Sequence, residues 1–472
     1  MTLRIVALFA IMLLAGCSLH NPTRPTLPID PPPEYLENQA VAEPGLPLDQ
    51  WWQVFNDEHL NRLMTELFAH NLELSQSLAR LEQVESAFRI TRSVQSPTLS
   101  AGGILSRSRQ PGVADNFTGN SQQLSLAAGY ELDLWGKLAA QSRAASLEVT
   151  ASRQDVQTLY LGLSARLADL YFLAVEQRAQ LALTDQIVAS FSDTAARVES
   201  RYSKGLVPAV DMYQARQSLA GAQASRHLFE ARLAEAEHAT GVLLGRYPER
   251  SPGGSTAQLP AAPALFRVGI PADLISQRPD LLAALQRVAA ADARVAAAIA
   301  DRFPAISLSG NYGSLRQEVT TALIKGEFWS LLGNLALPVI DGGRRRAEVD
   351  RNEALLREAV AAYQQRVLLA FQEVEDALVN NFTTEQRIER LAETAQATGA
   401  TLRLSTERYL VGLVDYLPVL TAQRADAETR SSLLGAQRQL LADRISLARA
   451  LGGDWMQHEM NSRLQVEKDK QR

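Results

Sequence analysis

The chain has 472 residues, of which 21% are charged and only 6% are aromatic, and its formal net charge is −5. This length exceeds one ordinary compact domain, the composition favours long helices, and the slightly acidic balance argues against nucleic acid as a partner. Cys17 is the only cysteine, which excludes an intrachain disulfide and a thiolate metal cluster.

The first seventeen residues predict a lipoprotein signal. Eleven apolar residues, 5–15, are too few to span a bilayer as a helix but are typical of the core of a secretory signal. The sequence "LLAGC" then ends at Cys17 and resembles the lipobox of bacterial lipoproteins. We predict a signal peptide at 1–16 and a Cys17 that carries N-palmitoyl and S-diacylglycerol groups. An ordinary signal peptide with an incidental cysteine is the alternative.

A proline-rich segment separates this signal from the first helix. Eight prolines lie between residues 18 and 50, so neither a helix nor a central strand can persist there. We predict that residues 17–50 form a stiff, extended tether anchored by the lipid. Amphipathic spacing then predicts a helix near 57–94, and similar spacing predicts one near 271–302 in the second half.

The period of the apolar residues changes to two after the first helix. Within residues 121–134, apolar side chains occupy alternate positions, as in a half-buried strand. This pattern predicts a β-hairpin at about 97–135, and a similar pattern predicts a second hairpin at about 304–340. Glycines would turn each hairpin into the helix that follows it, namely Gly136, Gly342 and Gly343.

A heptad pattern follows each hairpin. Between residues 156 and 202, twelve of fourteen heptad positions are apolar, and 207 residues later ten of fourteen are apolar. Such a pattern predicts supercoiled helices, and a helix over 137–204 would be about 100 Å long. Gly205 and Gly412 would end the two long helices. Shorter returning helices are predicted near 209–246 and 416–452.

The two halves of the chain repeat one another. "RYSKGLV" at 201–207 and "RYLVGLV" at 408–414 agree at five of seven positions, and the offset is 207 residues. The same offset relates Pro97 to Pro304, so we predict a tandem duplication. The predicted segments are a first repeat at 51–250, a linker at 251–264, a second repeat at 265–453, and a polar tail at 454–472 that we expect to fray.

The predicted strands are long enough to cross a membrane. A soluble antiparallel sheet packed on a helix is the alternative. The lipobox favours the membrane, and outside the signal no stretch approaches eighteen apolar residues. Four strands cannot close a membrane barrel, and lipid does not tolerate an open sheet edge. Several copies must therefore share one barrel, with eight strands from two chains or twelve from three.

Taken together, the motifs resemble those of the TolC-like outer membrane factors, in the NodT/OprM-type lipoprotein branch that serves drug efflux. The matching stretches run from residue 17 to 453 and include "LLAGCS", "WWQVFNDEHLNRL", "YELDLWGK", "RPDLLAA", "FPAISLSG", "LPVIDGGRRRAEV", "RYLVGLVDYLPVLTAQR" and "LARALGG". The resemblance implies a mainly α-helical chain with a transmembrane β part. It also implies a homotrimer, whose shared twelve-stranded barrel continues into a long periplasmic helical barrel.

The resemblance further implies the function and the partners. The chain would be the passive outer-membrane duct of a tripartite system that exports drugs and toxic small molecules. Its partners would be a periplasmic adaptor and an inner-membrane pump of the RND or MFS type. A duct for type I protein secretion is an alternative, and a structural coiled-coil lipoprotein is a weaker one. Because the duct is passive, its substrates cannot be read from its sequence.

The resemblance also places a periplasmic gate at the second helix tip. The matching residues are Leu417, Thr421 and Arg424, with Tyr409 and Asp415 nearby. Many efflux relatives carry an aspartate where this chain has Thr421, and Asp415 or Asp211 could supply negative charge instead. We expect contacts among Tyr409, Arg424 and the tip carboxylates to hold the gate shut. The alternative is that these residues only cap helices. Tyr202 is the equivalent of Tyr409 in the first repeat.

Catalytic and metal-binding motifs are not evident. The six histidines have no spacing typical of a metal site, so we expect no metal, no cofactor and no enzymatic activity. The stretch "GGRRRAEVD" lacks the spacing of a phosphate-binding loop. Arg344, Arg345 and Arg346 would lie near lipid headgroups or form a solvated run of charge.

Overall fold

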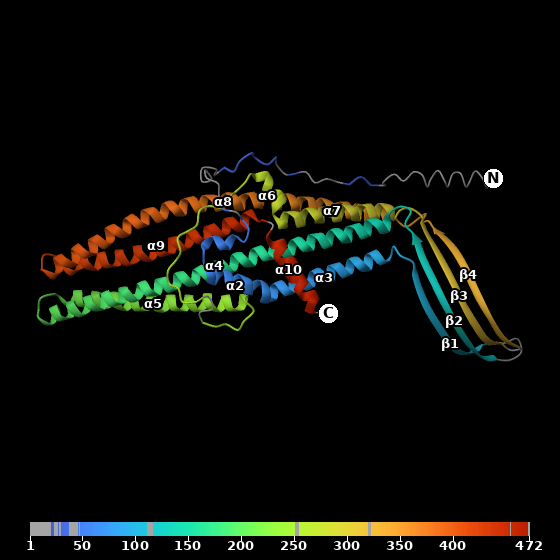
Figure 1. Cartoon of the computed structure of the whole chain (residues 1–472), viewed down its shortest axis with the longest axis horizontal. Helices are drawn as coiled ribbons and strands as arrows, with labels where there is room; N and C mark the ends of the chain where they lie inside the picture. The colour runs from blue at the N-terminus through green and yellow to red at the C-terminus, as the bar shows by residue number, and fades with distance from the viewer. Residues whose placement is uncertain are drawn as a thin grey trace. The chain divides into compact units, whose positions relative to one another are not determined.

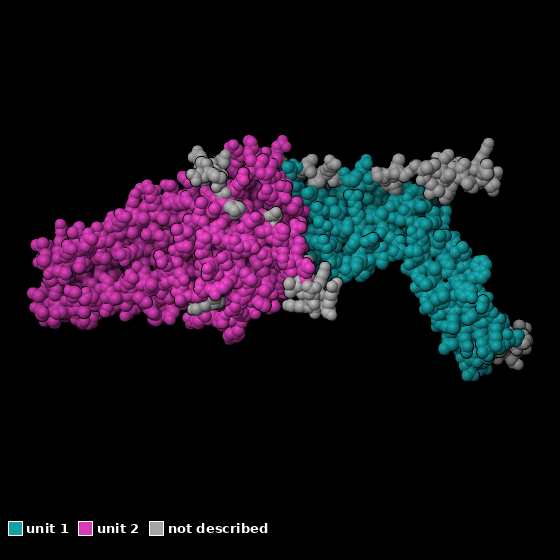
Figure 2. Space-filling view, in the orientation of Figure 1, with its two compact units in different colours: residues 1–27, 80–153, 283–365 teal, residues 28–79, 154–282, 366–472 magenta. Residues whose placement is uncertain are grey.

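The computed structural model describes residues 20–22, 27, 30–36, 46, 48–110, 117–250, 254–319, 322–453 and 455–470. The predicted signal peptide and Cys17 therefore lie outside the described residues. The chain divides into two compact units (Figure 2). Unit 1 comprises residues 1–27, 80–153 and 283–365, and unit 2 comprises residues 28–79, 154–282 and 366–472.

Unit 1 contains one sheet of four antiparallel strands in the order β1-β2-β3-β4 (Figure 1). The strand count and type confirm the prediction from alternation. Consecutive strands pair, so β1 and β4 are the two open edges. The strands are β1 (Thr98–Gln110), β2 (Phe117–Leu132), β3 (Ala305–Val319) and β4 (Ala322–Ala336).

The register of the sheet aligns rows of apolar side chains from neighbouring strands on one face. Leu126 lies opposite Tyr312, which lies opposite Trp329, and residues paired directly share a face. Six residues further towards the helices, Leu132, Ile306 and Leu335 form the equivalent row. Trp329 is 78% exposed and Leu335 is 61% exposed, so none of the described residues covers this face at these positions. Opposite pairs such as Ser309 with Leu332 belong to the other face.

Two helices of 67 residues follow the hairpins, as the heptad pattern predicted. They begin and end 207 residues apart, and so do the starts of the helices that return after them. Because the elements repeat at the offset seen in the sequence, the duplication extends to the structure. The helices are α4 (Lys137–Ser203), α5 (Ala209–Leu243), α8 (Arg344–Leu410) and α9 (Tyr416–Leu451).

The helix predicted near 57–94 is two helices, and so is the one predicted near 271–302. Each break contains a polar residue whose side chain caps a returning helix. Asn71 donates to the carbonyl of Leu243 in α5 at 2.7 Å. Arg278 donates to the carbonyl of Ala450 in α9 at 3.1 Å. These contacts are related by the repeat offset, and the Leu243 and Ala450 carbonyls are among the last of their helices, where intrahelical partners run out. The short helices are α2 (Glu58–His70), α3 (Leu72–Ser93), α6 (Pro271–Gln277) and α7 (Pro279–Ala300).

The C-terminal segment corrects one expectation. Instead of a fraying tail, the structure has a helix, α10 (Trp455–Lys470). Trp455 is 3% exposed, and its ring centroid lies 4.9 Å from that of Trp52 in the short helix η2 (Trp51–Phe55). Among the side chains of α10 that the structure describes, the apolar Trp455, Met456 and Met460 are buried. That number is too small to produce a periodic signal, but it is enough to hold the helix in place.

One described helix, α4, contains an 18-residue window apolar enough to cross a membrane by length and composition. The sequence predicts no continuous stretch of eighteen apolar residues outside the signal. Within the protein, 61% of the window is buried, which is typical of a core helix and makes it weak evidence for a span.

Candidate functional site

The repeated "RY-x-x-G-L-V" sequences form two identical turns at the ends of α4 and α8. Gly205 and Gly412 have φ of +70° and +78°, a left-handed conformation that glycine adopts without strain. In each turn the amide after the glycine donates to the carbonyl of the arginine, Arg201 or Arg408, at 2.9 Å. The amide of Gly205 donates to the carbonyl of Tyr202, and the amide of Gly412 donates to that of Tyr409. This is the Schellman arrangement, which ends a helix while pairing its last carbonyls.

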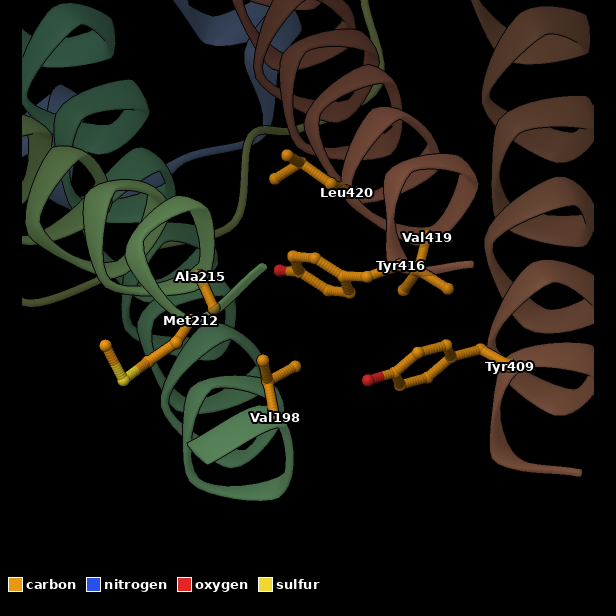
Figure 3. Packing of buried hydrophobic residues seen from close by; sticks show 7 residues of the cluster. All are labelled: Val198, Met212, Ala215, Tyr409, Tyr416, Val419 and Leu420. Atoms are coloured by element: carbon orange, nitrogen blue, oxygen red, sulfur yellow. The ribbon is translucent and has the colours of Figure 1, made fainter. Parts of the chain in front are cut away.

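An apolar cluster joins the two tips (Figure 3). In the figure, the rings of Tyr409 and Tyr416 point from the second-repeat helices toward those of the first repeat. Their centroids are 5.8 Å apart. The cluster comprises Val198, Met212 and Ala215 from the first repeat, and Tyr409, Tyr416, Val419 and Leu420 from the second.

Tyr409 is the most informative of the predicted gate residues. Its side chain is 4% exposed, and its hydroxyl is buried with no hydrogen-bond partner in the described part of the chain. The guanidinium of Arg201 lies 4.8 Å from the ring centroid, and Arg201 also donates to the Tyr409 carbonyl at 3.4 Å. Burial raises the pKa of Tyr409, and burial together with Tyr409 raises that of Tyr416 to about 12. Both phenols are therefore neutral at physiological pH.

The contacts of Arg424 differ from those expected. We predicted contacts among Tyr409, Arg424 and the tip carboxylates, but Arg424 donates to the hydroxyl of Ser218 at 3.2 Å. Within the described residues, the Tyr409 hydroxyl forms no hydrogen bond to Arg424 or to a carboxylate. Arg424 and Ser218 lie on α9 and α5, so this hydrogen bond links the two repeats at another point.

The two tip carboxylates are close enough to interact. Burial, and then the charge of Asp415, raise the pKa of Asp211 above its ordinary value. Asp211 lies in the first turn of α5, whereas Asp415 is the N-cap residue of α9 and makes no side-chain capping bond. Thr421 donates to the carbonyl of Leu417 at 2.9 Å, and the Leu417 side chain is 58% exposed.

Aspartates, which the sequence analysis did not single out, organise the strand-to-helix turns. The carboxylate of Asp133 accepts hydrogen bonds from two amides in the first turn of α4, at 3.1 and 2.7 Å. The carboxylate of Asp341 accepts from the amide of Gly343, just before α8, at 3.0 Å, and from that of Arg345, in its first turn, at 3.3 Å. Asp301 pairs with both Lys137 (2.8 Å) and Arg345 (3.0 Å). Glycines with positive φ make the turns, namely Gly136, Gly342 and Gly343.

Arg201 and Tyr416 are the residues that sequence reasoning missed at the tip. Both belong to stretches that the sequence analysis quoted, "RYSKGLV" and "DYLPVLTAQR". The only available signal was that Arg201 recurs at the repeat offset as Arg408. Among the described residues, no group of three or more His, Cys, Asp or Glu side chains could hold a metal ion. The buried side chains at the tip form apolar contacts between helices of the two repeats.

Comparisons with known proteins agree with this architecture. Residues 63–246 and 270–453 each match the model of a family described as outer membrane efflux protein. The chain is 32% identical to the outer membrane protein OprJ of Pseudomonas aeruginosa, over 95% of each chain. It is 30% identical to the solvent efflux pump outer membrane protein SrpC of Pseudomonas putida, over 96% of this chain and 99% of that one. A structure of the outer-membrane channel OprN superposes with a TM-score of 0.85 and 26% identity, covering 93% of this chain and 100% of that one.

Proposed function

Because this chain belongs to the outer membrane efflux protein family and is an outer-membrane efflux channel, we propose that three copies form one passive duct through the outer membrane and the periplasm. The duct carries small toxic compounds out of the cell. It works with a periplasmic adaptor and an inner-membrane pump of the RND or MFS type. Relatives named for solvent, toluene and antibiotic efflux support this class of substrate.

The single observation that carries the proposal is the exposed apolar face of a sheet with two open edges. Side chains such as Trp329 and Leu331, 78% and 74% exposed, would be unfavourable in water but suit lipid. The unpaired edges of β1 and β4 must be satisfied within a membrane. A second copy of the chain satisfies them if β4 of one copy pairs with β1 of the next.

Three copies fit this role better than two. Two copies give eight strands, and the interior of an eight-stranded barrel is filled by its own side chains. Three copies give twelve strands and leave a lumen. The long helix α8 also exposes large apolar side chains, including Leu368, Phe382 and Leu404 at 45%, 50% and 52%. The helices of the next copy cover them in the proposed assembly.

The N-terminal anchor belongs to the same proposal. Acylation of Cys17 would tether the chain to the periplasmic leaflet of the outer membrane. Since a barrel embedded in lipid is held far more strongly than one or two acyl chains, the anchor contributes to sorting and assembly more than to retention.

The helix tips form the gate of the duct in this proposal. Tips are suited to opening because helix ends have the fewest stabilising contacts. The Tyr409–Tyr416 cluster and the Arg201–Tyr409 contact hold the first-repeat and second-repeat tips together. They therefore favour the shut state, and the exposed residues Asp415 and Leu417 face the opening.

The proposal is tested by mass and conductance together. The purified chain in a mild detergent should have the mass of a trimer by native mass spectrometry, and it should form ion-conducting pores in planar bilayers. A monomer that conducts would contradict the sharing of strands. A trimer with no conductance, even after substitutions that loosen the tips, would contradict the duct.

A further inference from the structure

Two basic side chains lie directly opposite one another on the sheet. Arg316 of β3 pairs in register with Lys325 of β4, so both project from the same face at neighbouring positions. Like charges directly opposite destabilise a sheet unless an anion lies between or near them. Both side chains are exposed, and neither has an ion pair or a hydrogen bond to another described residue. Neither cation is therefore ion-paired within the described chain, although two carboxylates lie nearby on the same face.

The nearby carboxylates are already engaged. Glu318 and Glu327 lie two residues along from Arg316 and Lys325 and share their face. Glu318 accepts two hydrogen bonds from Asn120, at 3.1 and 2.7 Å. Glu327 accepts one from the hydroxyl of Tyr312 at 3.0 Å. Neither carboxylate pairs with the two cations, which leaves both cations available to an external anion.

The position of the pair indicates which anion this is. Four residues along the strands, on the same face, Tyr312 lies opposite Trp329. An aromatic row of this kind marks the boundary of the apolar band in membrane barrels. The two cations lie about 13 Å along the strands from that aromatic row. They are on the side of the β3–β4 connection, away from the helices. If the helices extend into the periplasm, this edge meets the outer leaflet.

A hollow lies next to the pair on the same face. It has a volume of about 530 Å³, and its lining includes Gly103, Leu126, Tyr312 and Glu327. The absence of a side chain at Gly103 and the small one at Ala101 open this space between leucines. A cation pair beside a hollow lined mainly by apolar and small residues, with Glu327 at its edge, is complementary to a molecule with a phosphate head and acyl chains.

We propose that Arg316 and Lys325 bind a phosphate group of the phosphorylated glycolipid in the outer leaflet, whose acyl chains cover the hollow and the aromatic row. The proposal rests on the membrane placement of the proposed function. A guanidinium binds phosphate through two parallel hydrogen bonds, and the ammonium adds a point charge. Arg107 lies on the same face of β1 and increases the positive potential at this edge.

The test uses the purified full-length protein in a non-ionic detergent, titrated with diphosphoryl lipid A. Binding to the double variant Arg316→Gln/Lys325→Gln should be at least tenfold weaker than to the parent. The matched control is Arg387→Gln/Arg403→Gln, which removes the same charge from exposed positions of α8 far along the helix from the strands. It should bind as the parent does. Lipid A without phosphates should bind the parent as weakly as the double variant binds the intact lipid.

Two further measurements complete the experiment. Millimolar inorganic phosphate should not displace the lipid, because the acyl chains contribute to binding; displacement would show a simple anion site and overturn the lipid assignment. In detergent without lipid A, the double variant should melt no lower than the parent, since a like-charge pair has been removed. Lipid A should raise the melting temperature of the parent and the control, but not that of the double variant.

The inference is overturned if the double variant binds lipid A like the parent, or if the control loses as much affinity. Conductance in planar bilayers separates this failure from failure of the proposed function. If parent and double variant conduct equally but bind lipid A equally well, only the lipid site is wrong. If the parent forms no pore, the membrane placement itself fails.

Discussion

Replacing Tyr409 with alanine should open the tip of the duct, whereas replacing it with phenylalanine should keep the tip shut. Tyr409 is 4% exposed and packs its ring against Tyr416 and beneath Arg201. Alanine removes the ring and both contacts. Phenylalanine keeps the ring and removes only a buried hydroxyl that has no partner among the described residues.

The expected magnitude follows from these contacts. A partly desolvated cation–π contact contributes about 1–2 kcal/mol. Taking the lower value for each chain, loss of the Arg201 contact in a trimer removes about 3 kcal/mol from the shut state. Because about 1.4 kcal/mol corresponds to a factor of ten, the ratio of open to shut channels should rise about 100-fold in Tyr409→Ala. An unpartnered buried hydroxyl costs about 1–3 kcal/mol, so Tyr409→Phe should be neutral or should favour the shut state.

The assay is single-channel open probability in planar bilayers, with entry of a large antibiotic into cells as a second measurement. Tyr202→Ala is the matched control, because Tyr202 occupies the equivalent position in the first repeat but is 41% exposed. It should behave as the parent. The reasoning is refuted if Tyr409→Phe opens the channel as much as Tyr409→Ala does, or if Tyr202→Ala opens it equally.

Three further predictions concern other parts of the chain. Cys17→Ser should abolish labelling by palmitate while most of the exported protein still assembles, and unchanged labelling would contradict the lipid anchor. Burial and the charge of Asp415 raise the pKa of Asp211. The Asp211 carboxylate therefore binds a proton more tightly in the folded tip than in the unfolded chain. The folded tip consequently gains stability as the pH falls through the raised pKa. Open probability should therefore fall on acidification in the parent but less so in Asp211→Asn, and equal pH profiles would contradict this. Trp455→Ala should lower the free energy of unfolding by about 3–5 kcal/mol in chemical denaturation, while the exposed His458→Ala should change it little; equal effects would mean that α10 contributes no packing.

Local patterns in the sequence were sufficient to predict the elements. Alternation of period two identified the strands and the face on which Leu126, Tyr312 and Trp329 would lie, because side chains of a strand alternate whatever it packs against. The heptad pattern identified the two long helices. Gly205 and Gly412 could be placed at helix ends because the left-handed conformation there requires a residue without a side chain.

Only the tertiary structure decided which of these residues contact one another. Arg201–Tyr202 and Arg408–Tyr409 have the same local sequence and make the same turn, yet Tyr409 is 4% exposed and Tyr202 is 41% exposed. The difference arises because Tyr409 packs against first-repeat residues such as Arg201 and Val198, from the other half of the chain, as well as against Tyr416. The same reason explains why Arg424 bonds to Ser218 and why the polar helix α10 packs on Trp52. Local spacing determines which side of an element a residue occupies, whereas the partner on that side depends on how distant segments pack.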